Sequence, residues 1–288
     1  MTDDIFVFDR NLVRQKRNRS APHLKEHGFL IDWSMNQILS RLKDIRREYP
    51  TALQIGCRTD NLNKDDFGIE TLIKLDIAEN LSPDIQADEE LLPFRGNSFD
   101  LVLSPLNLHS TNDLPGTLSQ INHILKPDGL FIAAMLGGET LYEARDIMQN
   151  TEIALSGGTS PRISPFADMQ QMGALMQRAG FNLPVIDSEK ITVTYDHPFK
   201  LFNDLRFMGE ANTLLMRKKT FSSRKFFQEV SERYFEKYSE GGKIKATFEV
   251  IFLIGWAPHE SQQKPSKPGS AEHRLSEALQ VKEEKLPC

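Results

Sequence analysis

Acidic side chains follow two short apolar runs of the sequence at positions suited to binding a polar small molecule. Asp76 ends the run 71–76, and Asp88 and Glu89 follow the run 84–87. Asp76 comes about 20 residues after Gly56, a separation at which an acidic side chain reaches both hydroxyls of a ribose. A carboxylate suits this contact because it accepts two hydrogen bonds without donating any. The pattern indicates a nucleoside site, and the alternative is that Asp76 only caps a turn.

Asp88, Glu89 and the nearby His109 could contribute further contacts to this site. Asp88 or Glu89 would accept from the amino group of an adenine, against the alternative of a capped turn. His109 lies in the loop after the run 99–104, which would cover the same cleft. A loop histidine satisfied by a hydrogen bond is more frequent than one that transfers protons, so we assign His109 no catalytic role.

These residues need a scaffold that brings the ends of several strands together. Apolar runs of strand length lie at 52–56, 71–76, 84–87, 99–104 and 130–136, separated by helical or loop stretches. This alternation is typical of a parallel sheet covered on both faces, whose ligands bind beyond the carboxyl ends of the strands. We therefore expect an α/β, doubly wound fold, with a helix over 114–125 and a turn at 126–129 before the fifth strand.

The regions on either side of these runs have patterns of their own. Apolar residues recur every three or four positions over 31–49, which predicts a helix that stops before Pro50. Beyond the fifth run we expect helices over 141–154 and 166–179, a strand pair or one long strand over 183–195, charged helices over 199–238 and a strand over 247–256. From Pro258 the composition predicts an exposed, largely disordered tail.

The composition limits the class of protein. The 288 residues carry a formal net charge of −5. This charge does not indicate the excess of basic residues that is typical of nucleic-acid-binding proteins. With only Cys57 and Cys288, neither a disulfide framework nor a Cys/His metal cluster is expected. The acidic start and the lack of an apolar run long enough to cross a bilayer predict a cytoplasmic protein without a transmembrane segment.

A basic block lies near the start of the chain. Between Arg10 and Lys25 there are six basic residues and no acidic one. A solvated helix face is the more frequent explanation for such a block. The alternatives are that it docks an acidic partner or helps to close the cleft.

Four segments are similar, in order and spacing, to the central motifs of the class I S-adenosylmethionine-dependent methyltransferases. They are 87–94, 97–102, 108–109 and 124–129. A narrower resemblance covers most of the chain, to the family of complex I assembly factors described as arginine hydroxylases and to their bacterial homologues. It rests on the segments 8–10, 76–80, 112–115, 137–143, 163–166, 208–210, 254–256 and 259–261. The malonyl-carrier-protein methyltransferases of biotin synthesis resemble the chain more distantly.

The resemblance implies a Rossmann-like seven-stranded methyltransferase sheet whose last strand lies antiparallel beside the fifth. It implies an N-terminal helical extension over 1–49, a methyltransferase-like domain over 50–257 with a helical cap at about 198–242, and a tail over 258–288. The implied cofactor is S-adenosylmethionine. Its implied contacts are Gln54, Gly56, Cys57, Arg58, Asp76, Ile77, Asp88, Glu89 and Ser104. No catalytic residue and no metal ligand is assigned.

The first motif departs from the family pattern. The family has an acidic residue two positions before the first glycine and further glycines at alternate positions. Here Gln54 takes the place of the acid, and Arg58 and Asp60 take the places of two glycines. Loss of a charged hydrogen bond costs about 1.5 to 3 kcal/mol. A side chain at a close-approach glycine costs about 1 to 3 kcal/mol through strain.

Three functions remain open at this point. The first is a methyltransferase that binds S-adenosylmethionine and acts on a protein or small-molecule acceptor. The resemblance makes a protein side chain connected with respiratory complex I assembly the expected acceptor, and it also implies arginine hydroxylation. The second is a scaffold without cofactor that acts as an assembly or binding factor. The third is an α/β protein with a different small-molecule pocket.

Overall fold

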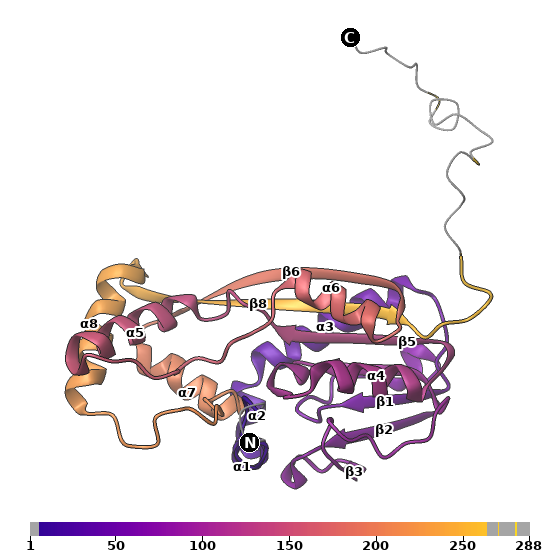
Figure 1. Ribbon diagram of the computed structural model, residues 1–288, viewed down its shortest axis with the longest axis horizontal. Helices are drawn as coiled ribbons and strands as arrows, with labels where there is room; N and C mark the ends of the chain where they lie inside the picture. The colour runs from indigo at the N-terminus through magenta and orange to yellow at the C-terminus, as the bar shows by residue number, and fades with distance from the viewer. Residues whose placement is uncertain (1–5, 264–269, 271–279, 281–288) are drawn as a thin grey trace. The chain divides into compact units, whose positions relative to one another are not determined.

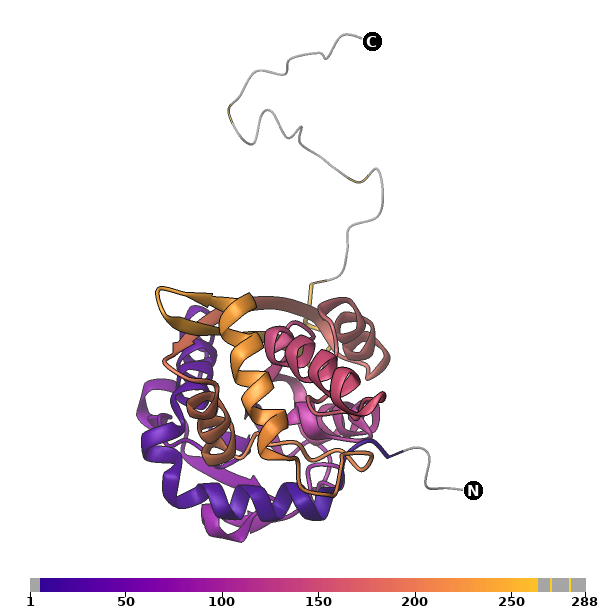
Figure 2. The ribbon, with the colours of Figure 1, turned by 90° about the vertical axis from the view of Figure 1, so that its left-hand side faces the viewer.

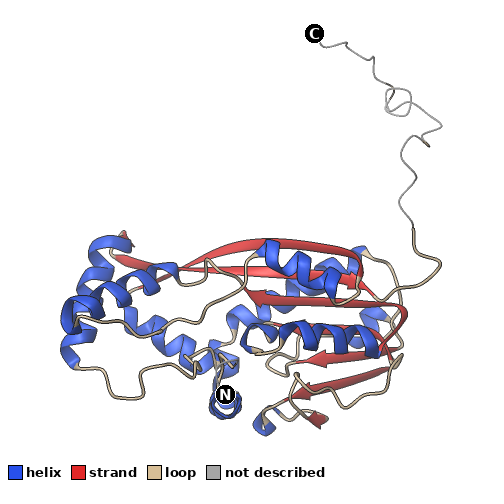
Figure 3. Cartoon of the chain, viewed as in Figure 1, coloured by secondary structure: helices blue, strands red, loops and turns tan. Residues whose placement is uncertain are grey.

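Five strands follow the expected apolar runs and pair in parallel within one sheet. They are β1 Thr51–Ile55, β2 Thr71–Asp76, β3 Ile85–Gln86, β4 Phe99–Pro105 and β5 Leu125–Leu136. The structure is a computed structural model that describes residues 6–263, 270 and 280. Nearly every side chain of β4 is buried, as expected for a parallel strand covered on both faces. Figures 1 and 3 show β1, β2 and β3 side by side, and β5 on the other side of α4 in this view.

Antiparallel strands complete the sheet, whose order is β3-β2-β1-β4-β5-β8-β6. β8, Lys243–Trp256, runs antiparallel to β5 on one side and to β6, Asn182–Tyr195, on the other. The short β7, Ser239–Glu240, pairs with β8. The seven-stranded order with the last strand beside the fifth is confirmed. Of the two alternatives for 183–195, the structure has one long strand.

Helices cover both faces of the sheet. One face packs on α3, Phe29–Asp44, α5, Tyr142–Ser156, and α8, Arg224–Tyr238. The other packs on α4, Leu114–Ile124, and α6, Met169–Arg178. Successive strand residues serve opposite cores: Leu101 and Leu103 of β4 belong to the first and Val102 to the second. Figure 2 shows α5 and α8 side by side.

The two chain segments outside the sheet meet near the carboxyl ends of the parallel strands. At the N-terminus, α1, Arg10–Ser20, is followed by η2, Ala21–His23, and α2, Leu24–His27. In the cap, α7, Pro198–Met208, is followed by the segment 209–223. A bridge between Phe8 and Leu214 joins the two regions. Figure 1 shows α1 beside the ends to which the arrows of β1 and β2 point.

The helix expected over 31–49 ends early, at Asp44. Tyr49 continues the apolar spacing and is buried, but its backbone N–H donates to Phe67 instead of extending the helix. Arg46 has a φ of 50°, which a helix does not allow. The expected range was therefore wrong at its end, because Tyr49 reaches the core from the irregular segment after the helix.

The turn expected at 126–129 lies within β5 instead of before it. The β4–β5 register shifts between Phe99 and Leu101, which leaves the residues of the turn as an irregularity in the ladder. Asp128 adopts a φ of 63° there. Such an insertion bends a strand without ending it.

Two contact units divide the chain, one up to Pro258 and one from His259. The expected boundaries at 49 and 257 stay predictions, and most of the expected tail over 258–288 lies outside the described residues. Within the part of the chain that the structure describes, no helix has both the length and the apolar character that crossing a membrane requires.

Candidate functional site

The loop after β1 is held by its own side chains. Gly56 has a φ of 97°, a conformation that side chains other than glycine rarely adopt. Gln54 is fully buried, and its Nε2 donates to the carbonyls of Gly56 and Thr59 at 2.9 and 3.3 Å. A carboxylate cannot donate, so the amide is what lets residue 54 hold both carbonyls.

Asp76 stands at the tip of β2 and faces this loop. It is 1% exposed, and its carboxylate accepts from the backbone N–H of Cys57 and of Ala78, each at 2.9 Å. The capping alternative therefore describes a contact that Asp76 does make. Arg17 of α1 places its Nη1 3.6 Å from the same carboxylate. Burial, with Asp76 nearby, raises the pKa of the Cys57 thiol, which stays protonated.

Asp88 and Glu89, at the tip of β3, are bound by arginines of the same helix. Arg10 lies 2.6 Å from Asp88 and 2.8 Å from Glu89, and Arg17 lies 3.5 Å from Glu89. Burial favours a raised pKa for the fully buried Glu89, but Arg17 and Arg10 outweigh it and hold that pKa below its usual value. Glu89 is therefore ionised and shared between two guanidinium groups.

This pairing overturns the expectation of a solvated face for part of the basic block. Arg17 is 3% exposed, although its neighbour Arg14 is exposed as expected. A buried guanidinium requires a counter-charge, and Asp76 and Glu89 provide it. α1 thus lies against the strand tips because its charges complement the acids there.

A second buried ionic cluster joins the loop after β1 to the cap. Arg58 pairs with Glu210 and donates to the carbonyls of Leu106 and Met208. His109 Nε2 lies 2.8 Å from the other carboxylate oxygen of Glu210. Burial favours a raised pKa for Glu210, but His109 and Arg58 outweigh it and keep that pKa well below the usual range. His109 Nδ1 is buried and has no hydrogen-bond partner among the described residues.

Side chains fill the space in front of Gly56. A Cβ built on Gly56 would lie 2.9 Å from Asn107 Oδ1, and the Asn107 amide donates to Glu89 at 3.1 Å. The hollow lined by Arg17, His109 and Glu210 has a volume of about 30 Å³. That is the share of one water molecule in the liquid. Gly56, Asp76 and Asp88 do not line this small hollow.

The structure gathers most of the residues expected to contact a cofactor. Around the tips of β1, β2 and β3 it places Gln54, Gly56, Cys57, Arg58, Asp76, Asp88 and Glu89. Ile77 follows Asp76 and is half-buried. Ser104, near the end of β4, is fully buried, and its Oγ lacks a hydrogen-bond partner in the described part of the chain. Their roles toward a cofactor stay predictions.

Four residues of the site were not singled out by sequence reasoning: Arg10, Arg17, Asn107 and Glu210. Signals were present for three of them. The basic block over 10–25, which contains Arg10 and Arg17, had closing of the cleft among its alternatives, and Asn107 lies two residues before His109. Glu210 lies far along the chain in the cap, and no spacing rule connects it with Arg58.

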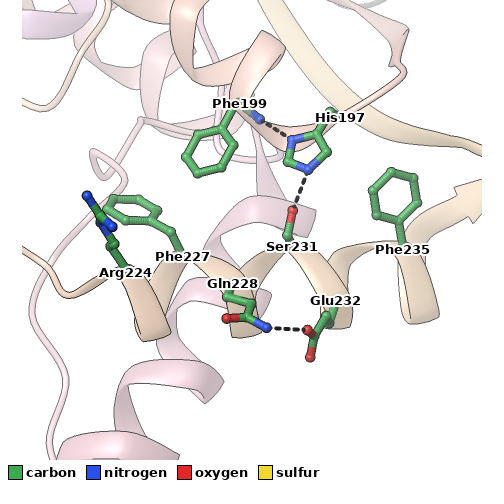
Figure 4. Close-up of a pocket in the computed structure, with 8 residues that line it drawn as sticks. All are labelled: His197, Phe199, Arg224, Phe227, Gln228, Ser231, Glu232 and Phe235. Carbon is green, nitrogen blue, oxygen red and sulfur yellow. Dashed lines mark hydrogen bonds between the residues drawn. The ribbon is translucent and has the colours of Figure 1, made fainter.

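A separate hollow of about 570 Å³ lies between α7 and α8 and has aromatic walls (Figure 4). His197 Nε2 lies 3.1 Å from Ser231 Oγ, a pair that resembles an activated nucleophile. However, His197 Nδ1 accepts from the backbone N–H of Phe199 at 3.2 Å. The proton is then on Nε2, which donates to Ser231 instead of taking its proton. This pair is a helix cap, not a catalytic dyad.

No cluster of three or more His, Cys, Asp or Glu side chains within the described ranges is arranged to hold a metal ion.

Comparison with known proteins identifies the class of this fold. A model described as a methyltransferase domain matches residues 53–133. A solved phosphoethanolamine N-methyltransferase 2 of Haemonchus contortus, in complex with S-adenosylhomocysteine, superposes with a TM-score of 0.50 at 16% identity, over 86% of this chain and 60% of its own. Together with the sheet order, these matches identify the class I methyltransferase fold.

Two groups of curated relatives cover nearly the whole chain. The arginine hydroxylase NDUFAF5, mitochondrial, of Homo sapiens is 42% identical over 282 residues, which are 92% of this chain and 81% of that protein. The malonyl-[acyl-carrier protein] O-methyltransferase of Methylovorus sp. (strain MP688) is 30% identical over 280 residues, 90% of this chain and 92% of that protein. The chain belongs to the family of the arginine hydroxylase NDUFAF5.

The site has the residue types that S-adenosylmethionine, the expected cofactor, requires, but these side chains are bonded to others of the chain. Asp76 and Glu89 are acids at the tips of two neighbouring strands, as a nucleoside requires. Both are engaged by Arg17, and the space beside Gly56 is filled by Asn107. In the conformation described here, arginines of α1 therefore hold the acids that were expected to contact the cofactor.

Proposed function

We propose that the protein is a methyltransferase that binds S-adenosylmethionine at the tips of β1, β2 and β3 after α1 withdraws its arginines from the acids. The observation that carries this proposal is that two guanidinium groups of one helix, those of Arg10 and Arg17, occupy Asp76, Asp88 and Glu89 together. A helix that ion pairs hold at one end of a sheet can have two positions, one bound to the acids and one released from them.

The proposed contacts follow the expected set. Asp76 and Ile77 would contact the ribose portion, and Asp88 and Glu89 the adenine. Gln54, Gly56, Cys57 and Arg58 would line the loop, and Ser104 the floor. When bound, the cofactor supplies an activated methyl group on a sulfonium, so the chain has mainly to orient the acceptor.

The acceptor is proposed from the relatives. We propose a protein side chain, because NDUFAF5 is named an arginine hydroxylase. A relation to respiratory complex I assembly stays a prediction from the resemblance. A small-molecule acceptor stays the alternative. The location also stays a proposal: the composition led us to expect the cytoplasm, while the printed names of these relatives include the word mitochondrial.

A scaffold without cofactor is the second candidate, and a specific observation favours it. Gln54 and Arg58 do not merely replace family residues: both are buried, and the Gln54 amide nitrogen and the terminal nitrogens of Arg58 donate to oxygens of the chain itself. A scaffold would keep this closed arrangement permanently.

Calorimetric titration of S-adenosylmethionine separates the two candidates. The enzyme proposal expects native binding in the micromolar range, weakened about tenfold or more by Asp76→Asn because a charge-assisted hydrogen bond to the ribose is lost. Asp84→Asn is the matched control, since exposed Asp84 bonds only the backbone of Lys74. Binding gained only by an Arg58→Gly, Asp60→Gly variant, with none by native protein, would support the scaffold, as would no binding by either.

A further inference from the structure

The largest cavity near the site lies beside the strand tips and not at the nucleoside crevice. Its volume is about 700 Å³, within the range of small-molecule sites. The carboxyl end of β5 contributes Leu136 and α5 contributes Met148, while Phe166 and Phe202 of the loop and the cap complete an apolar wall. A ligand there would bury an apolar body.

Three basic side chains from separate parts of the chain converge on this cavity. They are Lys16 of α1, Arg206 of α7 and Arg217 of the segment after α7. Lys16 Nζ donates to a backbone carbonyl, and Arg217 lies 3.5 Å from Asp9. Arg206 has no ion-pair partner among the residues described. The cavity wall therefore carries more positive charge than nearby acids balance.

The other charged groups at the cavity are already paired. Arg162 and Lys218 both contact Glu152, at 2.7 and 3.4 Å. The only acid on the wall, Glu210, is taken up by Arg58 and His109, as described above. No acid of the cavity is left to accept a cation.

Lys16 is partly buried at its charged end, and other cations lie near it. Burial, together with the nearby Arg217, lowers the pKa of Lys16 to about 8. An anion bound beside Lys16 would relieve that repulsion. A guanidinium or ammonium group would add to it.

We infer that this cavity binds an anionic amphiphile: a carboxylate or phosphate head between Lys16, Arg206 and Arg217, with an apolar chain along the wall of Leu136, Met148 and Phe202. The apolar wall disfavours a polyanion such as a nucleotide, and the basic rim disfavours a cationic side chain. This site goes beyond the proposed function and does not need the cofactor.

Calorimetry on the full-length chain without cofactor tests the inference with three probes that share a ten-carbon tail. Decanoate and decyl phosphate are expected to bind below their micelle concentrations, and decyltrimethylammonium to bind at least about tenfold more weakly. Whichever anion binds more tightly identifies the head group. Equal binding of the cationic probe would overturn the inference, as would no binding of either anion.

Variants separate the site from unspecific uptake of a detergent. Arg206→Gln and Arg217→Gln are each expected to weaken decanoate binding about fivefold, the upper range for a solvent-accessible ion pair. Arg14→Gln removes an exposed arginine of α1 that does not line the cavity, and it should leave binding unchanged. Unchanged affinity in both test variants contradicts the inference. Because S-adenosylmethionine is absent, neither result depends on the proposed methyltransferase activity.

Discussion

At the scale of single residues, side chains of the loop after β1 bond to oxygens of the chain itself. Gln54 donates to two carbonyls of its own loop, and Arg58 reaches three oxygens, one on Leu106 and two on the segment 208–210. Both side chains depend on being donors. Family residues at these positions, an acid and a glycine, would leave the same carbonyls without partners.

Restoring the acid at position 54 should therefore destabilise the fold. We expect Gln54→Glu to lower the free energy of unfolding by about 2 kcal/mol or more, because a buried carboxylate would face two carbonyl oxygens. Urea denaturation at neutral pH measures it. The control Gln15→Glu, on the exposed side of α1, should change stability by less than about 0.5 kcal/mol. A stable Gln54→Glu variant would refute the role given to the amide.

At the scale of elements, Glu152 of α5 ties the loop 160–162 to its helix. It accepts from Arg162 and from both the backbone and the hydroxyl of Ser160, at 2.7 to 3.2 Å. Arg162 in turn stacks over the ring of Phe226 of α8, 4.1 Å from its centroid. Burial favours a raised pKa for Glu152, but Arg162 and Ser160 outweigh it and lower that pKa to about 2.

This shift predicts a pH-dependent contribution to stability. A depressed carboxyl pKa stabilises the fold above the unfolded pKa of about 4.5, and the contribution is lost as the pH falls toward about 2. Glu152→Gln should cost about 2 to 3 kcal/mol at pH 7, and the difference from native protein should shrink across that window. Chemical denaturation at several pH values checks this, with the exposed Glu236→Gln as control. A difference that does not change with pH would exclude the ionic contribution.

The elements themselves were largely predictable, because their apolar spacing reflects burial on both faces of the sheet. The end of α3 was not, since Tyr49 keeps helical spacing while its backbone bonds to Phe67. The acids of the site could be predicted because they come directly after the strands. Their arginine partners did not, because a run of basic residues reads alike whether it faces solvent or buried carboxylates.

At the scale of the whole molecule, the N-terminal helix and the cap close over the same end of the sheet. Arg10 and Arg17 hold α1 to the strand tips, while Arg58 and Glu210 hold the cap to the loop after β1. Breaking one partner of such buried pairs leaves the other charge uncompensated. Opening the crevice therefore requires a new partner for the acids, and a nucleoside would be one.

The affinity of S-adenosylmethionine for an Arg10→Gln variant tests this competition most directly. Arg10 contacts Asp88, Glu89 and Glu90, so its removal frees Asp88 from its ion pair and leaves Glu89 paired with Arg17 alone. Calorimetry should then show binding about tenfold tighter than in native protein. Arg14→Gln should bind as native protein does. Equal or weaker binding by Arg10→Gln than by Arg14→Gln would contradict the account, because the arginine would then not be standing where the cofactor must bind.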